Sequence, residues 1–411
     1  MSRQLIVIGG GAAGFFCAIN AARLNRSLQV SILEKSQKLL SKVRISGGGR
    51  CNVTHHCFDI GEMSANYPRG NNFVRKAFHQ FFTKDTIHWF EQRGVRLKAE
   101  NDGRMFPVTD SSQTIIDCLL READKYGVVV QTKTEVKEIT IGDRRFTLTT
   151  NDARKVSADL VCIASGGHPK TTLFDWLIKT GHSIAAPVPS LFTFNLTGNR
   201  ITALMGVSVP QVNVRIQGIK LAESGPLLIT HWGISGPAVL RLSAWGAREL
   251  AIRNWQFTAV INWLPDYKEE TLRKKFQQFR FDLAAQKIIN KNPFGLPQRL
   301  WEFLLDESGI NPDKRWTELA AKEQNKLIKN LCVYEFAVTG KTTFKEEFVT
   351  AGGIKLNEID PNTMMSRIVP GLYFAGEVMD VDGITGGFNF QHAWTSGFVA
   401  AKSIAGPGST G

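Results

Sequence analysis

The stretch RQLIVIGGGAAG, residues 3–14, decides the fold of the N-terminal part of the chain. It begins with an apolar run that is typical of an inner parallel strand. Gly9, Gly11 and Gly14 follow in the G-x-G-x-x-G spacing, and a helical pattern continues to about Leu24. Gly9 permits a tight turn, Gly11 lets backbone approach a pyrophosphate, and Gly14 allows close packing of helix on strand. The order strand, glycine turn, helix predicts a dinucleotide-binding unit.

An acidic residue completes this unit. A second apolar strand over residues 28–33 ends at Glu34, 20 residues after Gly14. A carboxylate at this place accepts hydrogen bonds from the adenosine ribose, while the helix N-terminus presents free N–H groups to the phosphates. The carboxylate disfavours a 2′-phosphate, so NADP is not expected here, and FAD and NAD both stay open. We assign this part of the site to Gly9, Gly11, Ala12, Ala13, Gly14, Glu34 and Lys35.

The far end of the chain decides between FAD and NAD. Residues 371–405 read GLYFAGEVMDVDGITGGFNFQHAWTSGFVAAKSIA, which predicts a strand ending at Glu377, a glycine turn, and a helix over about 390–404. A second helix N-terminus supplies positive potential that stabilises a reduced, anionic flavin, and NAD enzymes have no need of it. The pattern therefore favours FAD. The residues assigned to the cofactor here are Gly376, Glu377, Gly386, Gly387, Phe388, Asn389, Phe390 and Gln391.

A glycine-rich stretch after the second strand, KVRISGGGRCNVTHHC at residues 42–57, is expected to run along the cofactor. Consecutive glycines let backbone amides approach phosphate or flavin oxygens. Lys42, Arg44 and Arg50 supply positive charge, and we place Arg50 near the flavin or an anionic substrate. We therefore interpret the stretch as a cofactor-binding loop.

Two other interpretations of this stretch were weighed. Flavin disulfide reductases carry a C-x4-C pair beside the flavin, whereas Cys51 and Cys57 are spaced C-x5-C, and no predicted strand leads into a second G-x-G-x-x-G after residue 100. A zinc site made of Cys51, His55, His56 and Cys57 would lack a second ligand pair, and adjacent histidines rarely share one metal. We expect no metal site.

Two segments in the middle of the first domain add to the predicted site. Residues 159–170, DLVCIASGGHPK, predict a strand that ends in a glycine pair near the cofactor. TEVKEI at 134–139 precedes a predicted hairpin and would carry one apolar side chain towards the adenine. The residues assigned from these segments are Val136, Ser165, Gly166 and Gly167. No residue is assigned a catalytic role.

With these motifs in place, the chain resembles the BaiN/YhiN-like family of FAD flavoproteins, which includes aminoacetone oxidase-like members. The resembling stretches are IVIGGGAAG, KVRISGGGRCNVT, LITHWGISGPAVLRLS and AGEVMDVDGITGGFNFQHAWTSGF, spread over nearly the whole chain. The resemblance implies an FAD domain interrupted by an insert, noncovalently bound FAD and oxidoreductase chemistry. It also implies that Ser46, Gly49, Cys51 and Asn52 lie near the cofactor.

The domain organisation follows from changes in the pattern along the 411 residues. We expect an α/β fold, with a Rossmann-like FAD-binding domain of the two-dinucleotide-binding type over residues 1–189 and 346–405. It is interrupted by an insert of antiparallel β structure over 190–267 and helices over 268–345. A disordered tail is expected at 406–411.

Charge and hydrophobicity limit the classes of partner that the chain is expected to have. The net charge of +13 includes a surplus of 8 positive charges in residues 1–110 and of 4 in 264–345. Such an excess is compatible with a nucleic acid, an anionic cofactor or a solvated surface. No arginine–aromatic cluster of recognised type accompanies it, so nucleic acid is not expected as a partner. Without an apolar run of 18 residues or a signal-peptide core, we expect a cytoplasmic protein with no membrane contact, and the oligomeric state stays open.

The predicted activity is that of an FAD-dependent oxidoreductase with hydride transfer through flavin N5. NAD(P)H-linked reduction of a small organic substrate is favoured, with NAD(P)H bound transiently as electron donor. Oxidation of a small amine by O₂ is one alternative. An FAD-binding protein that modifies nucleic acid is another, suggested by the +13 charge.

Overall fold

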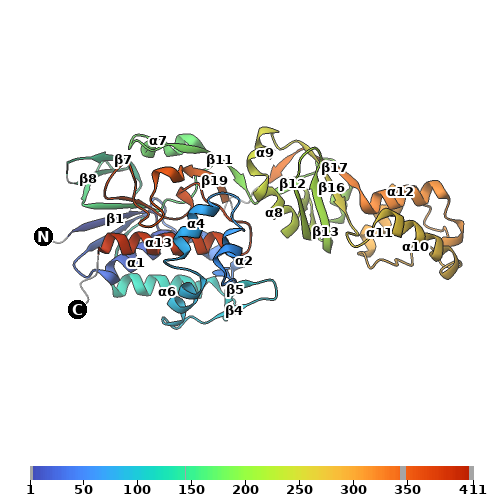
Figure 1. Ribbon diagram of the computed structural model, residues 1–411, viewed down its shortest axis with the longest axis horizontal. Coiled ribbons are helices and arrows are strands. Elements are labelled where there is room, and N and C mark those ends of the chain that lie inside the picture. Colours follow the sequence, from blue (N-terminus) through green and yellow to red (C-terminus); the bar gives the residue numbers. More distant parts are fainter. Residues whose placement is uncertain (1–2, 144, 343–348, 407–411) are drawn as a thin grey trace. The chain divides into compact units, whose positions relative to one another are not determined.

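The structure, a computed structural model, describes residues 3–143, 145–342 and 349–406. Tail residues 407–411 and the predicted boundary at 345/346 lie outside these ranges. The chain divides into two compact units (Figure 1): unit 1 comprises Met1–Ser190 and Phe344–Gly411, and unit 2 comprises Leu191–Thr343. Each unit is described by itself.

Unit 1 is built on a five-stranded parallel sheet with the order β20-β10-β1-β2-β6. Its strands are β1 (Gln4–Ile8), β2 (Gln29–Leu33), β6 (Val129–Gln131), β10 (Leu160–Ile163) and β20 (Leu372–Phe374). The chain leaves β1 on one side to form β2 and returns on the other side to form β10. In open parallel sheets, ligands bind outside the carboxyl ends of the strands at such a reversal of strand order.

Two long helices pack side by side in unit 1. They are α1 (Ala12–Leu24), which continues directly from the glycine turn, and α13 (Phe388–Ala405), near the end of the chain (Figure 1). Gly397 makes the close approach possible, because a Cβ at this position would stand only 2.8 Å from the backbone oxygen of Ala13. The contact places the N-terminal glycine motif and the C-terminal segment in one core.

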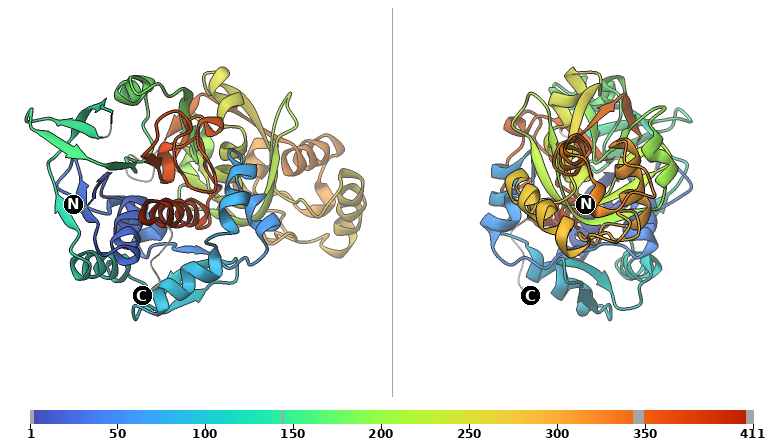
Figure 2. Two further views of the ribbon diagram at one scale, coloured as in Figure 1. Left: turned by 60° about the vertical axis from the view of Figure 1, so that its left-hand side comes forward. Right: turned by 90° about the vertical axis from the view of Figure 1, so that its right-hand side faces the viewer.

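The remaining elements of unit 1 surround this core (Figures 1 and 2). The helices are α2 (Ser41–Gly49), α3 (Ile60–Ser64), α4 (Asn71–Phe78), α5 (Thr83–Glu91), α6 (Ser112–Lys125) and α7 (Asp175–Ile178). The antiparallel strands are β3 (Thr54–His55), β4 (Leu97–Ala99), β5 (Arg104–Pro107), β7 (Val136–Ile141), β8 (Phe146–Thr150), β9 (Lys155–Ala158), β11 (Ile184–Ser190) and β19 (Val349–Ile354). The predicted hairpin after residue 134 is the β7–β8 pair.

Unit 2 combines a seven-stranded antiparallel sheet, ordered β17-β16-β13-β14-β15-β12-β18, with five helices among its described residues. The strands are β12 (Thr193–Asn195), β13 (Ser208–Ile216), β14 (Ala222–Thr230), β15 (Gly233–Ser235), β16 (Phe257–Asn262), β17 (Tyr334–Val338) and β18 (Gly340–Thr342). The helices are α8 (Pro237–Trp245), α9 (Ala247–Ile252), α10 (Glu269–Asp282), α11 (Gln298–Glu307) and α12 (Ala321–Cys332). Alternating burial along β13 and β14 is that of strands with one face on a core. One apolar cluster joins sheet residues such as Val214 to helix residues such as Trp301.

Candidate cofactor site

The carboxyl edge of the parallel sheet gathers predicted residues from four separate segments of the chain. Ile8 of β1 pairs with Leu33 of β2 and with Ile163 of β10, and Ile163 pairs with Phe374 of β20. The four strands therefore end level with one another, and the residues that follow them meet at one edge. These residues are Gly9, Gly11, Glu34, Lys35, Ser165, Gly166, Gly167, Gly376 and Glu377.

The three glycines of the first motif differ in what surrounds them. A Cβ at Gly9 would stand 2.3 Å from the backbone oxygen of Ala164, and one at Gly14 would stand 2.0 Å from the oxygen of Gly9. At Gly11, by contrast, no described atom lies within 4 Å of the Cβ position. Gly11 also caps α1, whose first turn receives no hydrogen bond from the side chain of its cap residue. Open space in front of free helix N–H groups fits a pyrophosphate.

Glu34 is held in place by backbone donors. Its Oε2 accepts from the N–H of Gly10 at 2.7 Å and its Oε1 accepts from the N–H of Ser36 at 2.8 Å. A carboxylate has further lone pairs, so it can still accept from ribose hydroxyls. The N–H of Thr134 donates to the Glu34 carbonyl, so the chain passes beside Glu34 two residues before the buried Val136.

The glycine-rich stretch starts as helix α2 and then breaks, where the sequence predicted a loop throughout. Gly47, Gly48 and Gly49 take positive φ values of 58°, 68° and 85°, which side chains with a Cβ rarely adopt. Gly47 packs against the ring of Phe106, but Gly48 and Gly49 have no described atom within 4 Å of their Cβ positions. The backbone of Gly48 and Gly49 is therefore open to a ligand. Ser46 donates from Oγ to the carbonyl of Val43.

Lys42 and Glu377 join this stretch to the C-terminal element. Lys42 Nζ lies 2.5 Å from Glu377 Oε2, and Glu377 Oε1 accepts from the N–H of Thr350 at 2.9 Å. A Cβ at Gly167 would stand 2.6 Å from Glu377 Oε1, so only glycine fits there. Glu377 itself lies in a 3-10 turn, Gly376–Val378, because the strand already ends at Phe374.

His168 and Thr350 belong to this edge, and the sequence analysis did not assign them. His168 Nε2 lies 3.2 Å from Ser165 Oγ. Burial, followed by the positive charge of Lys35, lowers the pKa of His168 to about 4, so the ring is neutral near pH 7. The Thr350 hydroxyl is buried and has no hydrogen-bond partner within the described ranges. An unpaired buried polar group beside an open glycine turn suits an edge that receives a ligand.

The second helix N-terminus is braced by the glycine-rich stretch. Gly387, with φ 95°, caps α13, which begins at Phe388 rather than near residue 390. In the amide orientation that satisfies both of its groups, Asn52 accepts from the N–H of Gly387 at 2.9 Å and donates to the carbonyl of Thr54. His55 Nδ1 lies 2.9 Å from the carbonyl oxygen of Gly386. Residues 52–55 thus hold the Gly386–Gly387 turn, which sets the direction in which α13 begins.

Some assigned side chains serve the fold and leave only their backbone for a cofactor. Gln391 is fully buried and its Oε1 accepts from the hydroxyls of Thr54 and Thr86, at 2.7 and 3.0 Å. Asn389 donates to and accepts from the backbone of Gly383. Ring contacts occupy the other two: Phe388 stacks on His55 and Phe390 on Trp394.

Arg50 and Arg44 also have partners in the protein. Arg50 pairs with Glu100 at 2.6 Å and with Asp110 at 3.6 Å, and it lies over the ring of Phe106. Arg44 donates to the side chain of Gln113. The placement of Arg50 beside the flavin or substrate stays a prediction; Glu100 and Asp110, its partners in the structure, also pair with Arg104 and Lys98.

The cysteines do not form a dithiol in this structure. All six are buried and free. Burial raises the pKa of Cys51 to about 12 and also raises the pKa of Cys57, so neither forms a thiolate at neutral pH. Among the described residues no group of histidines, cysteines and carboxylates could hold a metal ion.

His392 lies on α13, close to the start of the helix. Its Nε2 is 3.3 Å from the carbonyl oxygen of Gly376, and its Nδ1 has no partner in the described part of the chain. Burial lowers the pKa of His392 to about 4, so this ring is also neutral. Ser396, one turn further on, accepts from the N–H of Gly376 at 2.9 Å and ties the turn to the helix.

Comparison with known proteins identifies the family. Residues 3–403 match the family described as HI0933-like protein Rossmann domain. The chain belongs to this family. Its members are FAD-dependent oxidoreductases, so the predicted enzyme class, the predicted fold class and the resemblance to the BaiN/YhiN-like proteins are confirmed. The open phosphate cradle at Gly11 fits the dinucleotide that this family binds.

Three members of the HI0933-like family match over nearly their whole length. The ribosomal RNA dihydrouridine synthase of Escherichia coli (strain K12) is 34% identical over 97% of both chains. The protein of the same name from Haemophilus influenzae is 32% identical over 97% of this chain and 98% of its own. The 3-dehydro-bile acid delta(4,6)-reductase of Clostridium scindens is 28% identical over 97% of this chain and 98% of its own.

Solved structures support the fold at low sequence identity. The 3-ketosteroid-delta4-(5alpha)-dehydrogenase from Rhodococcus jostii RHA1 covers 97% of both chains with a TM-score of 0.52 at 13% identity. The open conformation of a flavocytochrome c3 fumarate reductase covers 98% of this chain and 78% of its own, with a TM-score of 0.51 at 15% identity.

None of the helices in the described ranges combines the length and the hydropathy that a membrane-spanning helix requires.

Proposed function

We propose that the protein is an FAD-dependent reductase that converts uridine in ribosomal RNA to dihydrouridine. Two relatives carry the proposal: both are named ribosomal RNA dihydrouridine synthases, and they are 34% and 32% identical over 97% of this chain. The net charge of +13 suits a polyanionic substrate. This proposal replaces the sequence-based preference for a small organic substrate, and the expectation that nucleic acid is no partner loses its support. Such a substrate also favours a cytoplasmic protein.

The proposed reaction balances as a two-electron reduction. The uracil C5=C6 bond is conjugated with the C4 carbonyl, so hydride adds at C6 and a proton at C5. Bound FAD supplies the hydride from its N5 position. NAD(P)H provides the two electrons and leaves as NAD(P)⁺, so one NAD(P)H and one proton are consumed for each dihydrouridine. Since no described strand leads into a second G-x-G-x-x-G after residue 100, we propose that NAD(P)H binds only transiently.

The residues at the carboxyl edge would hold FAD without a covalent bond. The α1 N-terminus at Gly11 would face the pyrophosphate, and Glu34 would accept hydrogen bonds from the ribose. The α13 N-terminus at Gly387 would contribute positive potential on the flavin side, which favours a reduced, anionic ring, while the charge of Lys42 is paired with Glu377. His168 stays neutral there, because its pKa is about 4.

Reduction of a small conjugated ketone is the second candidate. The bile acid reductase relative, 28% identical over 97% of this chain, supports it. Both candidates reduce a C=C bond conjugated with a carbonyl, so they share the same hydride chemistry and differ in the acceptor. The amine oxidase alternative stays a prediction.

An anaerobic experiment separates the candidates. The purified protein is reduced with NADPH or NADH carrying deuterium at C4, and then mixed with ribosomal RNA from cells that lack the gene or with a 3-keto-4-ene steroid. We expect the RNA to reoxidise the flavin and to gain deuterium in dihydrouridine, detected by nucleoside mass spectrometry. Reoxidation by the steroid alone would support the ketone reductase instead.

A further inference from the structure

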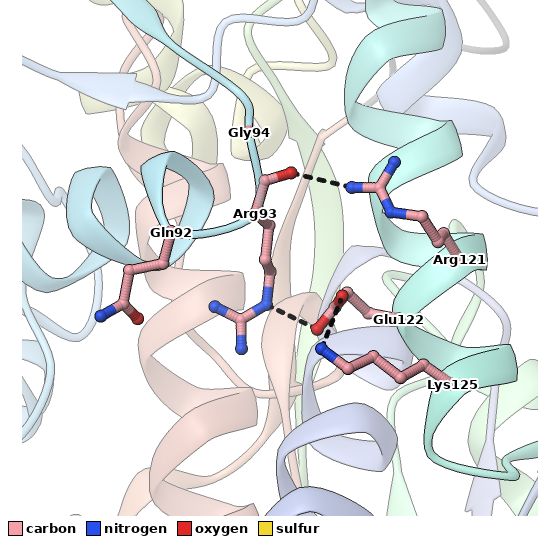
Figure 3. A pocket seen from close by; sticks show the side chains of 6 residues that line it. All are labelled: Gln92, Arg93, Gly94, Arg121, Glu122 and Lys125. Atoms are coloured by element: carbon pink, nitrogen blue, oxygen red, sulfur yellow. Dashed lines mark hydrogen bonds and ion pairs between the residues drawn. The ribbon is translucent and has the colours of Figure 1, made fainter.

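A hollow on unit 1 lies outside the cofactor edge (Figure 3). It has a volume of about 740 Å³ and is formed by the turn after α5 and one face of α6. We call it the basic hollow. Its lining residues are Gln92, Arg93, Gly94, Arg121, Glu122 and Lys125.

Cations outnumber acids in the lining. Arg93 Nε lies 2.8 Å from Glu122 Oε2, and Lys125 Nζ lies 3.7 Å from Glu122 Oε1 (Figure 3). Arg121 donates from Nη2 to the backbone carbonyl of Arg93 at 2.8 Å. Glu122 is the one carboxylate among three cationic lining residues, so the lining carries a net positive charge.

Two arginines at the end of α1 extend the cluster. Arg26 lies over the ring of Tyr126 at 4.4 Å, and Lys125 lies over the same ring at 5.3 Å, so the two cations converge. Arg23, in the last turn of α1, is electrostatically coupled to this group. Its pKa is lowered by burial first and then by the charge of Arg93; Tyr126 and Glu122 raise it, and Arg26 lowers it least.

The base of the hollow is buried, and two of its cations are exposed. The side chains of Arg93 and Glu122 are only 9% and 5% exposed. Arg93 also lies 3.9 Å over the ring of Trp89 and donates to the Trp89 carbonyl, so its orientation is fixed. Arg121 and Lys125 are exposed and can turn towards a ligand. Guanidinium groups in this arrangement favour phosphate, which they bind with two parallel hydrogen bonds.

The basic hollow cannot serve the phosphates of the cofactor. α1 runs from the carboxyl edge of the sheet at Gly11 to the opposite edge at Leu24, and its 13 residues span about 20 Å at 1.5 Å per residue. Arg23 lies in the last turn and the cofactor cradle at the first. The positive charge at the Leu24 end of α1 therefore lies too far from the cofactor phosphates to bind them. It is available to a second anion.

We propose that the basic hollow binds backbone phosphates of the RNA substrate while the target base enters the cofactor edge. The inference rests on the proposed function, since an RNA chain is long enough to reach both ends of α1. In RNA and DNA complexes, phosphate contacts supply much of the affinity and set the register, and base contacts supply the specificity. Contacts some 20 Å from the base are consistent with this division of roles.

The test uses the full protein with FAD bound and reverses the two exposed charges. Arg121→Glu with Lys125→Glu is compared with the milder Arg121→Gln with Lys125→Gln, in case the added carboxylates beside Glu122 disturb the fold. The matched control is Arg75→Glu with Lys76→Glu, an exposed pair in the last turn of α4 with the same change of charge. Arg121→Lys with Lys125→Arg keeps the charge.

Three quantities are measured on each variant: FAD content, bleaching of the flavin by NADPH, and affinity for a fluorescein-labelled oligouridylate and for ribosomal RNA from cells lacking the gene. We expect all three Arg121/Lys125 double changes to leave FAD content and flavin bleaching unchanged. We expect the charge reversal to weaken RNA binding by at least about 10-fold, the glutamine pair by less, and the control pair by less than about threefold.

Each outcome bears on a different claim. If the reversal at Arg121 and Lys125 leaves RNA affinity unchanged, or weakens it no more than the Arg75/Lys76 control, the basic hollow is not the phosphate site. If the wild-type protein binds neither RNA, the inference also fails. If it binds RNA through the hollow but forms no dihydrouridine, the inference stands and the proposed function fails.

Discussion

The two ends of α1 offer different kinds of binding group to negative charge. At its N-terminus, a backbone turn from Gly9 to Gly14 leaves open space and free N–H groups, and no cationic side chain is needed. At its other end, side chains from three separate segments converge around Tyr126 and Glu122. Backbone donors hold one ligand in one position, whereas flexible cations suit a polyanion that must bind and leave.

The cofactor edge and the basic hollow also differ in their balance of charge. At the cofactor edge, Lys42 is paired with Glu377 and the Glu34 carboxylate already accepts two backbone hydrogen bonds. In the basic hollow, Glu122 faces several cations. The first site should therefore depend little on ionic strength and the second strongly, because the attraction between exposed charges is screened by salt.

The largest expected effect is the loss of FAD on substitution of Gly11, and substitution of Gly14 should have a different effect. Gly11→Val should lower FAD affinity by at least about 100-fold, or roughly 3 kcal/mol, and leave a folded apoprotein, because the new side chain occupies only the space for the pyrophosphate. Gly14→Val should also unfold the protein, because its Cβ would stand 2.0 Å from the Gly9 oxygen. Flavin absorbance and thermal unfolding measure both. A full flavin complement in Gly11→Val would refute the cradle.

The next largest effect is that of salt concentration, which should weaken ligand binding at one end of α1 and not at the other. Affinity for RNA should fall steeply as salt rises, while FAD stays bound. Arg121→Gln with Lys125→Gln should make the slope of log affinity against log salt shallower by roughly 1.4, or about 0.7 for each lost phosphate contact. Titrations at several salt concentrations, with flavin absorbance recorded in parallel, give both numbers. An unchanged slope in the variant would place the phosphate contacts elsewhere.

A smaller difference should appear with pH. His392 is neutral in the folded protein because burial lowers its pKa to about 4, and the unfolded chain takes up the proton below about pH 6.5. His392 should therefore contribute a fall of about 2–3 kcal/mol to the free energy of unfolding as the pH drops from 6.5 to 4, and the buried His168, whose pKa is also about 4, should contribute a similar fall. His392→Gln should remove only its own share of this dependence. RNA binding through arginine and lysine should change little between pH 6 and 9.

The smallest effect is expected at the cysteines. Cys57→Ser should change the free energy of unfolding by no more than about 1 kcal/mol and leave flavin reduction intact, because the thiol only donates weakly to the carbonyl of Asp59. Arg50→Ala should likewise be mild, since Glu100 and Asp110 keep Arg104 and Lys98 as partners when Arg50 is removed. Rates of flavin reduction by NADPH check both. Complete loss of reduction in Cys57→Ser would revive the dithiol interpretation.

The backbone-determined parts of the molecule could be predicted from the sequence. The strand before Gly9, the helix after it and the strand ending at Leu33 lie within one or two residues of their predicted bounds. Each depends on contacts close in sequence, on apolar runs and on glycines that no other residue can replace. The same holds for the turn that starts α13, although the helix begins two residues earlier than expected.

Side-chain pairing over long distances could not be predicted. Nothing near Arg50 in the sequence indicates that Glu100 would pair with it, and nothing near Gln391 indicates that Thr54 and Thr86 would use its amide. The basic hollow was missed for the same reason, since its cations come from α1, α5 and α6. Such clusters exist only once the elements have packed, and composition shows no more than the excess of charge.

The proposed reaction is tested most directly by dihydrouridine in ribosomal RNA. Ribosomal RNA is isolated from cells that lack the gene, from the same cells carrying the wild-type gene, and from cells carrying Gly11→Val, and its nucleosides are measured by mass spectrometry. The proposal predicts that at least one dihydrouridine is absent without the gene, is restored by the wild-type protein and is not restored by Gly11→Val. Identical dihydrouridine content in all three samples would contradict it.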